Sequence, residues 1–345
     1  MQATFIGVDV SKAELVISIG DHALVDLVVS RDKLDCAVLD EQGQRVKRPR
    51  TFVNDAQGVL DLITWARSIA VDQLRRFVME ATAAYHEIAA TRLYDAGLLV
   101  SVVNPAQVRS LARGLGMLSK TDAIDAVLLA HYGRLAAPRP WRPVRQDLAQ
   151  FNAMLMRLDC VEADLRREQN RREQASVRRS AACVLLSIDQ SIEFLRGQRK
   201  SLRKLIDSLI ESSPTLSENV ARLRTIPAVG EKTANRMAAV LGANTFVSAK
   251  EAAAFLGLVP VKVESGVSVK GRARLSKAGN PRVRASLYMA AVVAKKVNPE
   301  IKALYERLCA QGKSKMSALG ACMRKLVHLC FGVLKSGKDY APPEQ

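Results

Sequence analysis

The sequence predicts an α/β region with a mixed sheet, followed by a helical middle and a mainly α-helical C-terminal region. Short apolar runs alternate with helical patterns over the first 140 residues. Residues 144–213 then contain no proline and one glycine, and their apolar residues recur at spacings of three and four. Positive charge accumulates toward the C-terminus. These observations predict three domains, at 1–140, 141–213 and 214–345.

The elements of the first region follow from short apolar runs and from the helical patterns between them. Helices are expected at 56–70 and 84–95, after the cap Asn104-Pro105, and from Asp122 onward. The order is β-hairpin-β-α-β-α-β-α-α, which matches a ribonuclease H-like fold, in which the first and fourth strands lie side by side. The runs that predict strands are 3–8, 15–19, 23–29, 34–39, 76–79 and 98–103.

Prolines 138, 140 and 143, around Trp141, mark the end of this region. The coiled-coil-like pattern that follows fits an intramolecular helical hairpin or a dimer interface, and the residues alone leave both open. From Pro214 onward the chain reads as a helix, a tight IPAVG turn and a second helix, a helix-hairpin-helix-like element. Asn280-Pro281 caps a further helix, and two more are expected near 299–311 and 315–334.

Composition and charge narrow the function. The net charge is +18, of which residues 1–140 contribute none, residues 141–210 contribute +5 and residues 211–345 contribute +13. The neutral N-terminal part is therefore predicted to carry out catalysis, and the basic C-terminal part is predicted to bind nucleic acid. The six scattered cysteines predict reduced thiols in a cytoplasm, and we expect no membrane span and no signal peptide.

Four acids stand where a metal site needs them. Asp9 and Glu80 each end an apolar, strand-like run, and Asp122 and Asp125 lie three apart on a predicted helix. Carboxylates at strand ends project from the sheet edge, and an i, i+3 pair shares one helix face. Hard oxygen ligands of this kind suit Mg²⁺ or Mn²⁺, which polarise phosphates. Each acid alone also has an ordinary structural role, such as a helix N-cap for Asp122.

Other polar residues are less informative by themselves. Ser265 and Ser268 lie in a basic, glycine-flanked loop, but a serine hydroxyl needs a base or a metal to become a nucleophile. From the residues alone, Ser265 is better explained as a turn or phosphate-contact residue. His86 on its helix is better explained by packing than by catalysis.

Longer blocks carry a more specific signal. The chain resembles the DEDD-type transposases of bacterial insertion sequences, which are related to Piv-type DNA invertases, and the resemblance covers nearly its whole length. It rests on blocks in fixed order: GVDVSK with Asp9, VMEATAAY with Glu80, VVNPAQVRSLA, SKTDAIDA with Asp122 and Asp125, IPAVGEKTA, FLGLVP, VESGVSVKGRARLSKAGNPRVR, GACMRKLVH and FGVLKSG.

The resemblance implies a RuvC-like N-terminal domain, a coiled-coil middle and a C-terminal transposase domain. It implies a recombinase guided by a structured bridge RNA that acts on donor and target DNA as a dimer or tetramer, in the cytoplasm with the nucleoid. The four acids, Asp9, Glu80, Asp122 and Asp125, would bind Mg²⁺. Ser265, which follows Glu264 in VESG, would attack DNA to form a 5′-phosphoserine link.

Two features depart from the family pattern. Ala83 stands in EATAAY where the family often has glycine, a change that stiffens a turn and touches no metal ligand. About twenty residues, from Ala13 to Arg31, separate GVDVSK from DKLD, whereas family members usually run from one almost directly into the other. This extra segment leaves open which strand pairs with the strand of Asp9.

We therefore expect an RNA-guided, Mg²⁺-dependent transposase that exchanges strands through a serine–DNA ester. A junction resolvase that uses the acids and water is one alternative, and it predicts no covalent adduct. A non-catalytic nucleic-acid-binding protein is another, and it predicts binding without cleavage. The basic residues expected to hold phosphates are Lys232, Lys270, Arg272, Arg274, Lys277, Arg282 and Arg284.

Overall fold

The computed structural model describes residues 24–29, 32–39, 45–69, 76–81, 85–117, 128–129, 131–133, 135–136, 138–262, 264–265, 269–270 and 273–342. Several residues and segments singled out above lie outside this set. They are Asp9, Ala83, Asp122, Asp125, Arg272 and the expected strands 3–8 and 15–19. The described chain divides into two compact units, Met1–Pro143 and Val144–Gln345. Each unit is described by itself below.

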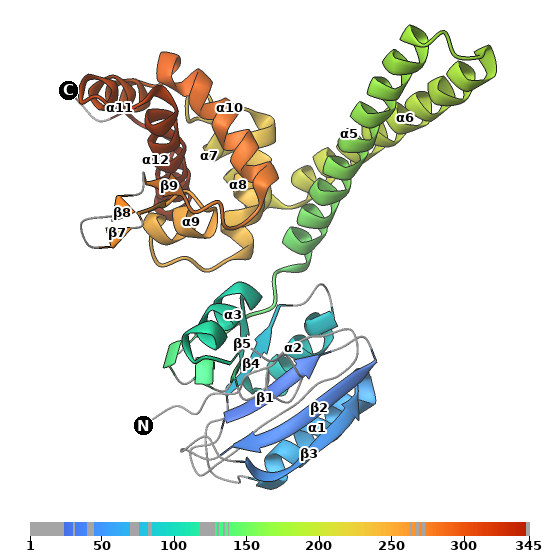
Figure 1. The fold of residues 1–345 in the computed structure, drawn as a ribbon, viewed down its shortest axis with the longest axis vertical. Helices are drawn as coiled ribbons and strands as arrows, with labels where there is room; N and C mark the ends of the chain where they lie inside the picture. The colour runs from blue at the N-terminus through green and yellow to red at the C-terminus, as the bar shows by residue number, and fades with distance from the viewer. Residues whose placement is uncertain are drawn as a thin grey trace. The chain divides into compact units, whose positions relative to one another are not determined.

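The first unit is built on a five-stranded mixed sheet (Figure 1). Its strand order is β3-β2-β1-β4-β5, in which β2 runs antiparallel to both of its neighbours, β1 and β3, whereas β1, β4 and β5 run parallel to one another. The strands are β1 (Leu24–Val29), β2 (Lys33–Leu39), β3 (Arg45–Val53), β4 (Arg76–Glu80) and β5 (Leu99–Val103). The mixed α/β character predicted for this region is confirmed.

Three helices accompany this sheet: α1 (Ala56–Ile69), α2 (Tyr85–Asp95) and α3 (Pro105–Gly114). Helix α3 begins as predicted, because Pro105 occupies its first turn and the Asn104 side chain accepts a hydrogen bond from the backbone N of Ala106. His86 is buried in α2, in keeping with a packing role. After the helical residues that follow, the backbone N of Trp141 donates to the carbonyl of Val100, at 2.6 Å.

Strand β3 was not expected from the sequence. Its residues RVKRPRTFV contain four Lys or Arg and one proline, and such a composition does not predict a strand. The strand is nevertheless tolerated because β3 lies at the edge of the sheet among the described strands, where sheets admit proline and charged residues. Its partner β2 shows register shifts between Cys36 and Leu39.

The second unit begins with a long helical hairpin, α5 (Gln146–Val177) and α6 (Ala182–Ser212). The two helices pack along each other in Figure 1. The apolar repeat is satisfied inside one chain, because Val161, Leu165, Ile192 and Ile206 are all buried without a second copy. The hairpin alternative therefore describes the isolated chain, and pairing with another protomer stays a prediction.

The rest of the second unit is mainly helical, as predicted. Its helices are α7 (Pro214–Arg224), α8 (Glu231–Ala243), α9 (Ala249–Phe255), α10 (Pro281–Val297), α11 (Pro299–Ala310) and α12 (Lys315–Ser336). Asn280 caps α10 by accepting from the backbone N of Arg282, and Asn298 caps α11 by accepting from the backbone N of Ile301. The core of this unit also includes Leu148, Phe151 and Ile206 from the hairpin.

Helix α12 corrects one expectation. By length and composition it is apolar enough to cross a membrane, although we expected no such stretch. Half of its apolar window is buried inside the protein, and Cys322, Leu326, Val327 and Cys330 are fully buried. Helices α9, α10 and α11 pack around it. We therefore interpret α12 as a core helix. Burial raises the pKa of the Cys330 thiol to about 12.

Candidate functional site

Glu80 is the one predicted metal ligand among the described residues, and it ends strand β4 as expected. The apolar residues Phe77, Val78 and Met79 are fully buried, and Glu80 itself is 6% exposed. The ladder to β5 continues past it, because the backbone N of Ala81 donates to the carbonyl of Val103. Burial of a carboxylate at the end of a central strand is costly unless the carboxylate is hydrogen-bonded, paired with a cation or bound to a metal.

The strand next to β4 differs from the one expected. Both edges of β4 are occupied, one by β5 and the other by β1, which carries Asp26 opposite Val78. We expected the strand that ends at Asp9 in the place of β1. That strand lies outside the described residues, and the extra segment around Ala13 to Arg31 supplies the neighbour of β4 instead. The reason is visible in the sequence, since LVDLVV is as apolar and β-branched as FIGVD.

Asp26 is a candidate that sequence reasoning missed. It stands inside an apolar run, whereas Asp9 was identified because it ends one. In the register of β1 with β4, Asp26 lies opposite Val78, which precedes Glu80 by two residues. If the register continues by two residues, Val28 lies opposite Glu80, at the end of the strand where a metal ligand was expected.

The helical segment after Asp125 lies on a defined face of the sheet. Leu128 and Leu129 pack in one buried cluster with Val78, Val103 and Val108 of α3. Since Val78 and Glu80 are two residues apart on one strand, their side chains share a face. The described residues that follow the predicted acid pair in the sequence therefore pack on the face of the sheet that Glu80 shares.

Metal ligation itself rests on residues that the structure leaves undescribed. Within the described ranges, no group of three or more His, Cys, Asp or Glu residues is arranged to hold a metal ion. Asp9, Asp122 and Asp125 do not belong to those ranges, so Glu80 alone represents the expected set. The donor chemistry of that set, four carboxylates of which one is buried at a strand end, fits Mg²⁺ or Mn²⁺.

Ser265 lies on a two-part β-hairpin between α9 and α10 (Figure 1). The base of the hairpin pairs β6 (Pro260–Val261) with β9 (Arg274–Leu275), and its outer part pairs β7 (Glu264–Ser265) with β8 (Val269–Lys270). In the outer pair Ser265 lies opposite Val269. The sequence predicted a loop here, and the structure gives instead a short ribbon that carries Ser265 close to its turn.

Two glycines allow close backbone packing at the base of this hairpin. Gly257 in FLGLVP and Gly279 in KAGNP have φ of +72° and +73°, a backbone conformation that favours glycine. A Cβ on Gly257 would meet the carbonyl oxygen of Ala278 at 2.1 Å, and a Cβ on Gly279 would meet that of Phe255 at 2.2 Å. The two segments therefore cross backbone to backbone, and a side chain at either glycine would displace the ribbon that carries Ser265.

The predicted phosphate-binding residues divide by what they contact. Arg284 Nη1 donates to the carbonyls of Ala278 and Gly279, and thus braces the loop before α10. Lys232 Nζ pairs with Glu162 at 2.5 Å. The structure also describes the side chains of three other predicted phosphate-binding residues: Arg282 and the exposed Arg274 and Lys277. For Lys270 it describes only the backbone.

A buried ion pair fastens α5 to the domain that carries this hairpin. Asp159 on α5 pairs with Arg236 on α8, and their side chains are only 13% and 11% exposed. Arg236 Nη1 also donates to the carbonyl of Arg282 at 2.9 Å, and Arg282 Nη1 lies 3.9 Å from Asp159. One carboxylate thus holds cations from α8 and α10 on α5, so two of these arginines help to fix the fold.

Glu162, one turn along α5, makes a second bridge. It accepts from Lys232 of α8 and from Arg203 of α6, at 2.5 and 3.2 Å. Burial alone would raise the pKa of this carboxyl, but the hydrogen bonds and charges of the two cations hold it below its usual value. Glu162 is therefore ionised at neutral pH and joins three helices.

The turn between α7 and α8 has the predicted helix-hairpin-helix-like form. Ile226 and Val229 are buried beneath it, and Gly230 begins α8. Ala228 has a φ of +78°, which is rare for a residue with a side chain and marks a tight turn. The first backbone N–H groups of α8 follow directly, an arrangement that suits a phosphate contact.

Comparison with known families gives two matches. Residues 26–175 match the family of DEDD transposases of IS110-type elements, which is described as "Transposase". Residues 220–306 match the "Transposase IS116/IS110/IS902 family". The first match begins at Asp26, in β1, and therefore does not include Asp9. The second includes the turn before α8, the Ser265 hairpin and α10.

Curated relatives agree with these families. The chain is 30% identical over 293 residues to the "Pilin gene-inverting protein" of Moraxella lacunata, which covers 84% of this chain and 89% of the relative. It is 29% identical over the same extents to the protein of that name from Moraxella bovis. A shorter match, 28% identical over 158 residues, joins 46% of this chain to 38% of an insertion element IS110 protein of Streptomyces coelicolor, described as uncharacterized.

Proposed function

The chain belongs to the IS110 family of DEDD transposases, and on this premise we propose that it is a Mg²⁺-dependent, RNA-guided DNA recombinase. It cuts and rejoins strands through a covalent serine–DNA ester. Its two predicted parts are an acid site in a RuvC-like, ribonuclease H-like first unit and a nucleophilic serine in the second. The observation that carries this proposal is the position of Ser265, next to the turn of a glycine-locked hairpin within the region that matches the transposase family.

The sheet of the first unit supports the ribonuclease H-like assignment. In that fold the first and fourth strands lie side by side and parallel, and β1, which takes the place expected for the strand of Asp9, lies parallel beside β4. Glu80 is buried at the end of β4, and the segment after Asp125 packs on the same face. In this proposal Asp9, Glu80, Asp122 and Asp125 hold the metal.

The chemistry assigns one task to each group. When bound, Mg²⁺ supplies Lewis-acid polarisation of the scissile phosphate. The Ser265 hydroxyl attacks the phosphorus and forms an O–P bond, while the bond from phosphorus to the 3′ oxygen breaks. The serine proton replaces that bond on the 3′ oxygen, which leaves as a hydroxyl. Attack by another 3′ hydroxyl on the phosphoserine reverses the step and joins new strands without hydrolysis.

The partners follow from charge and family. Residues 211–345 carry a net +13, which favours binding to donor and target DNA and to a structured bridge RNA. Exchange between two duplexes needs two or more active serines, so the working form is a dimer or tetramer. DNA inversion is a second candidate outcome of the same chemistry, favoured by the likeness to the pilin gene-inverting proteins over 84% of the chain.

A denaturing gel with end-labelled DNA tests the nucleophile. The wild-type protein, incubated with Mg²⁺, its element DNA and the RNA transcribed from the element, should form a band that survives denaturant and maps to the peptide around Ser265. Ser265→Ala should abolish both the band and strand exchange, whereas Ser268→Ala, three residues away, should retain them. Ser265→Cys should keep trace activity, since a thiolate is the stronger nucleophile. Efficient recombination by Ser265→Ala would assign the chemistry to water, as in a resolvase.

A further inference from the structure

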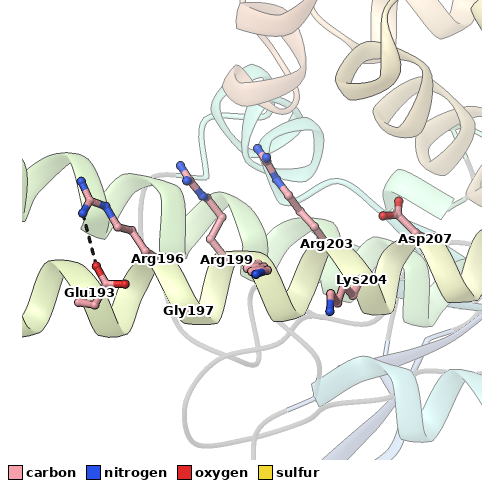
Figure 2. Close-up of a pocket in the computed structure, with 8 residues that line it drawn as sticks. Glu193, Arg196, Gly197, Arg199, Arg203, Lys204 and Asp207 are labelled. Carbon is pink, nitrogen blue, oxygen red and sulfur yellow. Dashed lines mark hydrogen bonds and ion pairs between the residues drawn. The ribbon is translucent and has the colours of Figure 1, made fainter.

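A groove of about 430 Å³ runs along helix α6, and its lining includes no residue of the Ser265 hairpin. Its lining contains five cations, Arg196, Arg199, Lys200, Arg203 and Lys204, and two carboxylates, Glu193 and Asp207. Figure 2 shows Arg196, Arg199 and Arg203 projecting side by side from the helix. These five cations were not among the phosphate-binding residues predicted from the sequence, and we call them the α6 stripe.

Helix geometry explains why these cations form one surface. They occur at positions i, i+3, i+4, i+7 and i+8, which is the spacing of residues on one face of a helix. Ile192 and Ile206 belong to the buried side of α6, so the stripe lies beside the seam with α5. All five cations stay at least partly exposed. The stripe is therefore a continuous positive surface and does not consist of scattered charges.

Neighbouring acids neutralise only two of the five cations in the stripe. Arg196 pairs with Glu193 at 3.4 Å and Arg203 pairs with Glu162 at 3.2 Å. Arg199, Lys200 and Lys204 have no ion-pair partner in the part of the chain that the structure describes. Most arginines of α5, the helix packed against α6, do have acidic partners: Arg167, Arg171 and Arg172 each pair with a carboxylate. Three uncompensated cations within two helical turns require an anionic partner or solvent.

From this geometry we propose that the α6 stripe binds the phosphate backbone of double-helical nucleic acid, as a contact separate from the C-terminal basic residues. The stripe runs over nine residues, from Arg196 to Lys204, so its ends lie about 12 Å apart along the helix. One strand of a DNA duplex presents a phosphate about every 3.4 Å along its axis, so about three or four phosphates face this length. Three free cations match that number. The proposal rests on the proposed function only in taking nucleic acid as the partner.

The shared chemistry is a phosphate backbone, and its source is the element DNA or a stem of the guide RNA. Arg199→Gln/Lys200→Gln/Lys204→Gln, made in the full chain, removes the three free cations. Arg167→Gln/Arg171→Gln/Arg172→Gln removes the same charge from the same hairpin and serves as the matched control. Circular dichroism should first show equal helix content and melting for both variants and the wild type.

Affinity is then measured between 50 and 200 mM salt, for a 30-base-pair DNA duplex and for an RNA stem-loop of the same length. Each phosphate contact to duplex DNA contributes about 0.9 to the slope of log affinity against log salt. The stripe variant should therefore lose about 2.7 from the slope. Over this fourfold salt range, wild-type affinity should fall about 40-fold more than that of the variant. The control should keep the wild-type slope.

The pattern over the two ligands identifies the source. A loss confined to the RNA stem assigns the stripe to the guide RNA, a loss confined to the duplex assigns it to DNA, and a loss in both assigns it to either backbone. An unchanged slope with both ligands, or an equal loss in the control, overturns the proposal. So does a stripe variant that loses affinity for polyglutamate only, because the partner is then an acidic peptide.

A footprint on the wild-type protein gives an independent readout. Lys200 and Lys204 should be protected from acetylation when duplex or stem-loop is bound, and equal modification with and without nucleic acid would also overturn the proposal. Failure here is distinct from failure of the proposed function, since the covalent adduct at Ser265 is scored separately on the denaturing gel.

Discussion

Asp26 of β1 lies opposite Val78 of the parallel strand β4, and Val78 precedes Glu80 by two residues. This pairing gives the sheet an aspartate next to its buried glutamate, but the aspartate lies inside β1, three residues before the strand ends at Val29. The family match also begins at Asp26. The chain thus has two acids, Asp9 and Asp26, that compete for the role of the first metal ligand.

We predict that Asp9 is the ligand, because it ends its apolar run as Glu80 does, whereas Asp26 precedes the strand end. Asp9→Asn and Glu80→Gln should each lower cleavage by about 100-fold or more, since each removes a charged ligand from the metal site. Asp26→Asn should stay close to wild type. The measurement is adduct formation at fixed Mg²⁺, with DNA binding as the control. Loss of the adduct in Asp26→Asn but not in Asp9→Asn would assign the ligand to β1.

The ion pair of Asp159 with Arg236 yields a prediction about stability. Both side chains are mostly buried, so Asp159→Asn leaves the positive charge of Arg236 with no counterion. Breaking such a pair costs about 3–5 kcal/mol of unfolding free energy. Urea unfolding of the full chain measures it. Asp164→Asn is the control, because its partner Arg167 is 68% exposed and the change should cost less than about 1 kcal/mol. Equal losses in the two variants would contradict the argument.

Much of the architecture was predictable from local signals. The caps Asn104-Pro105 and Asn280-Pro281 begin helices where expected, and helix α7 begins at Pro214. Such caps work through atoms within two or three residues, so a sequence reveals them. Strand β3 was missed because its edge position, a property of the whole sheet, makes its charges and proline acceptable.

The site was predictable only in part. Glu80 carried its own signal, an acid that ends an apolar strand, and the structure places it as expected. The choice of β1 as the neighbour of β4 depends on competition between two similar apolar segments, which no local pattern decides. Likewise, the contact of Arg284 in α10 with the carbonyls of Ala278 and Gly279 was not predictable, because the same basic residue can bind backbone carbonyls, phosphates or both. Phosphate binding by Arg284 stays a prediction.

Glu162 predicts a pH dependence of the three-helix junction. Its pKa in the folded protein is lowered from the ordinary value of 4.5 by Lys232 and Arg203, against the effect of burial. Its stabilisation is therefore complete well above pH 4.5 and is lost as the pH falls through the lowered pKa. Glu162→Gln should cost about 1 kcal/mol at pH 7, a value reduced by solvent screening. The difference in unfolding free energy between wild type and variant should disappear at acidic pH.

Thermal unfolding at pH 7, 5 and 3.5 measures this gap. Glu168→Gln, one and a half turns further along α5, is the matched control, because Glu168 pairs only with Arg171 on its own helix. Its gap to wild type should be small at each pH. A Glu162→Gln gap that stays constant down to pH 3.5 would show that the carboxylate charge contributes nothing to the junction.

The oligomer seam is best tested at residues that the hairpin leaves open. Leu202 and Leu209 follow the apolar repeat, but they are half-buried within the chain, so aspartate there would damage the hairpin itself. Phe194 and Leu205 are 66% and 53% exposed. They lie eleven residues apart, about three helical turns, and therefore share a face of α6. Two large apolar side chains held in water on one face favour pairing with a second protomer.

Phe194→Asp/Leu205→Asp should therefore convert the dimer or tetramer into monomers, because each new carboxylate would be buried in the seam without a counterion. Light scattering coupled to size exclusion gives the mass, and circular dichroism should show an intact hairpin. Gln169→Asp/Gln174→Asp adds the same charge at exposed positions of α5, outside this face of α6, and should leave the mass unchanged. If the wild type is a monomer with its guide RNA and DNA bound, or if the double variant keeps the wild-type mass, then α6 does not form the seam through this face.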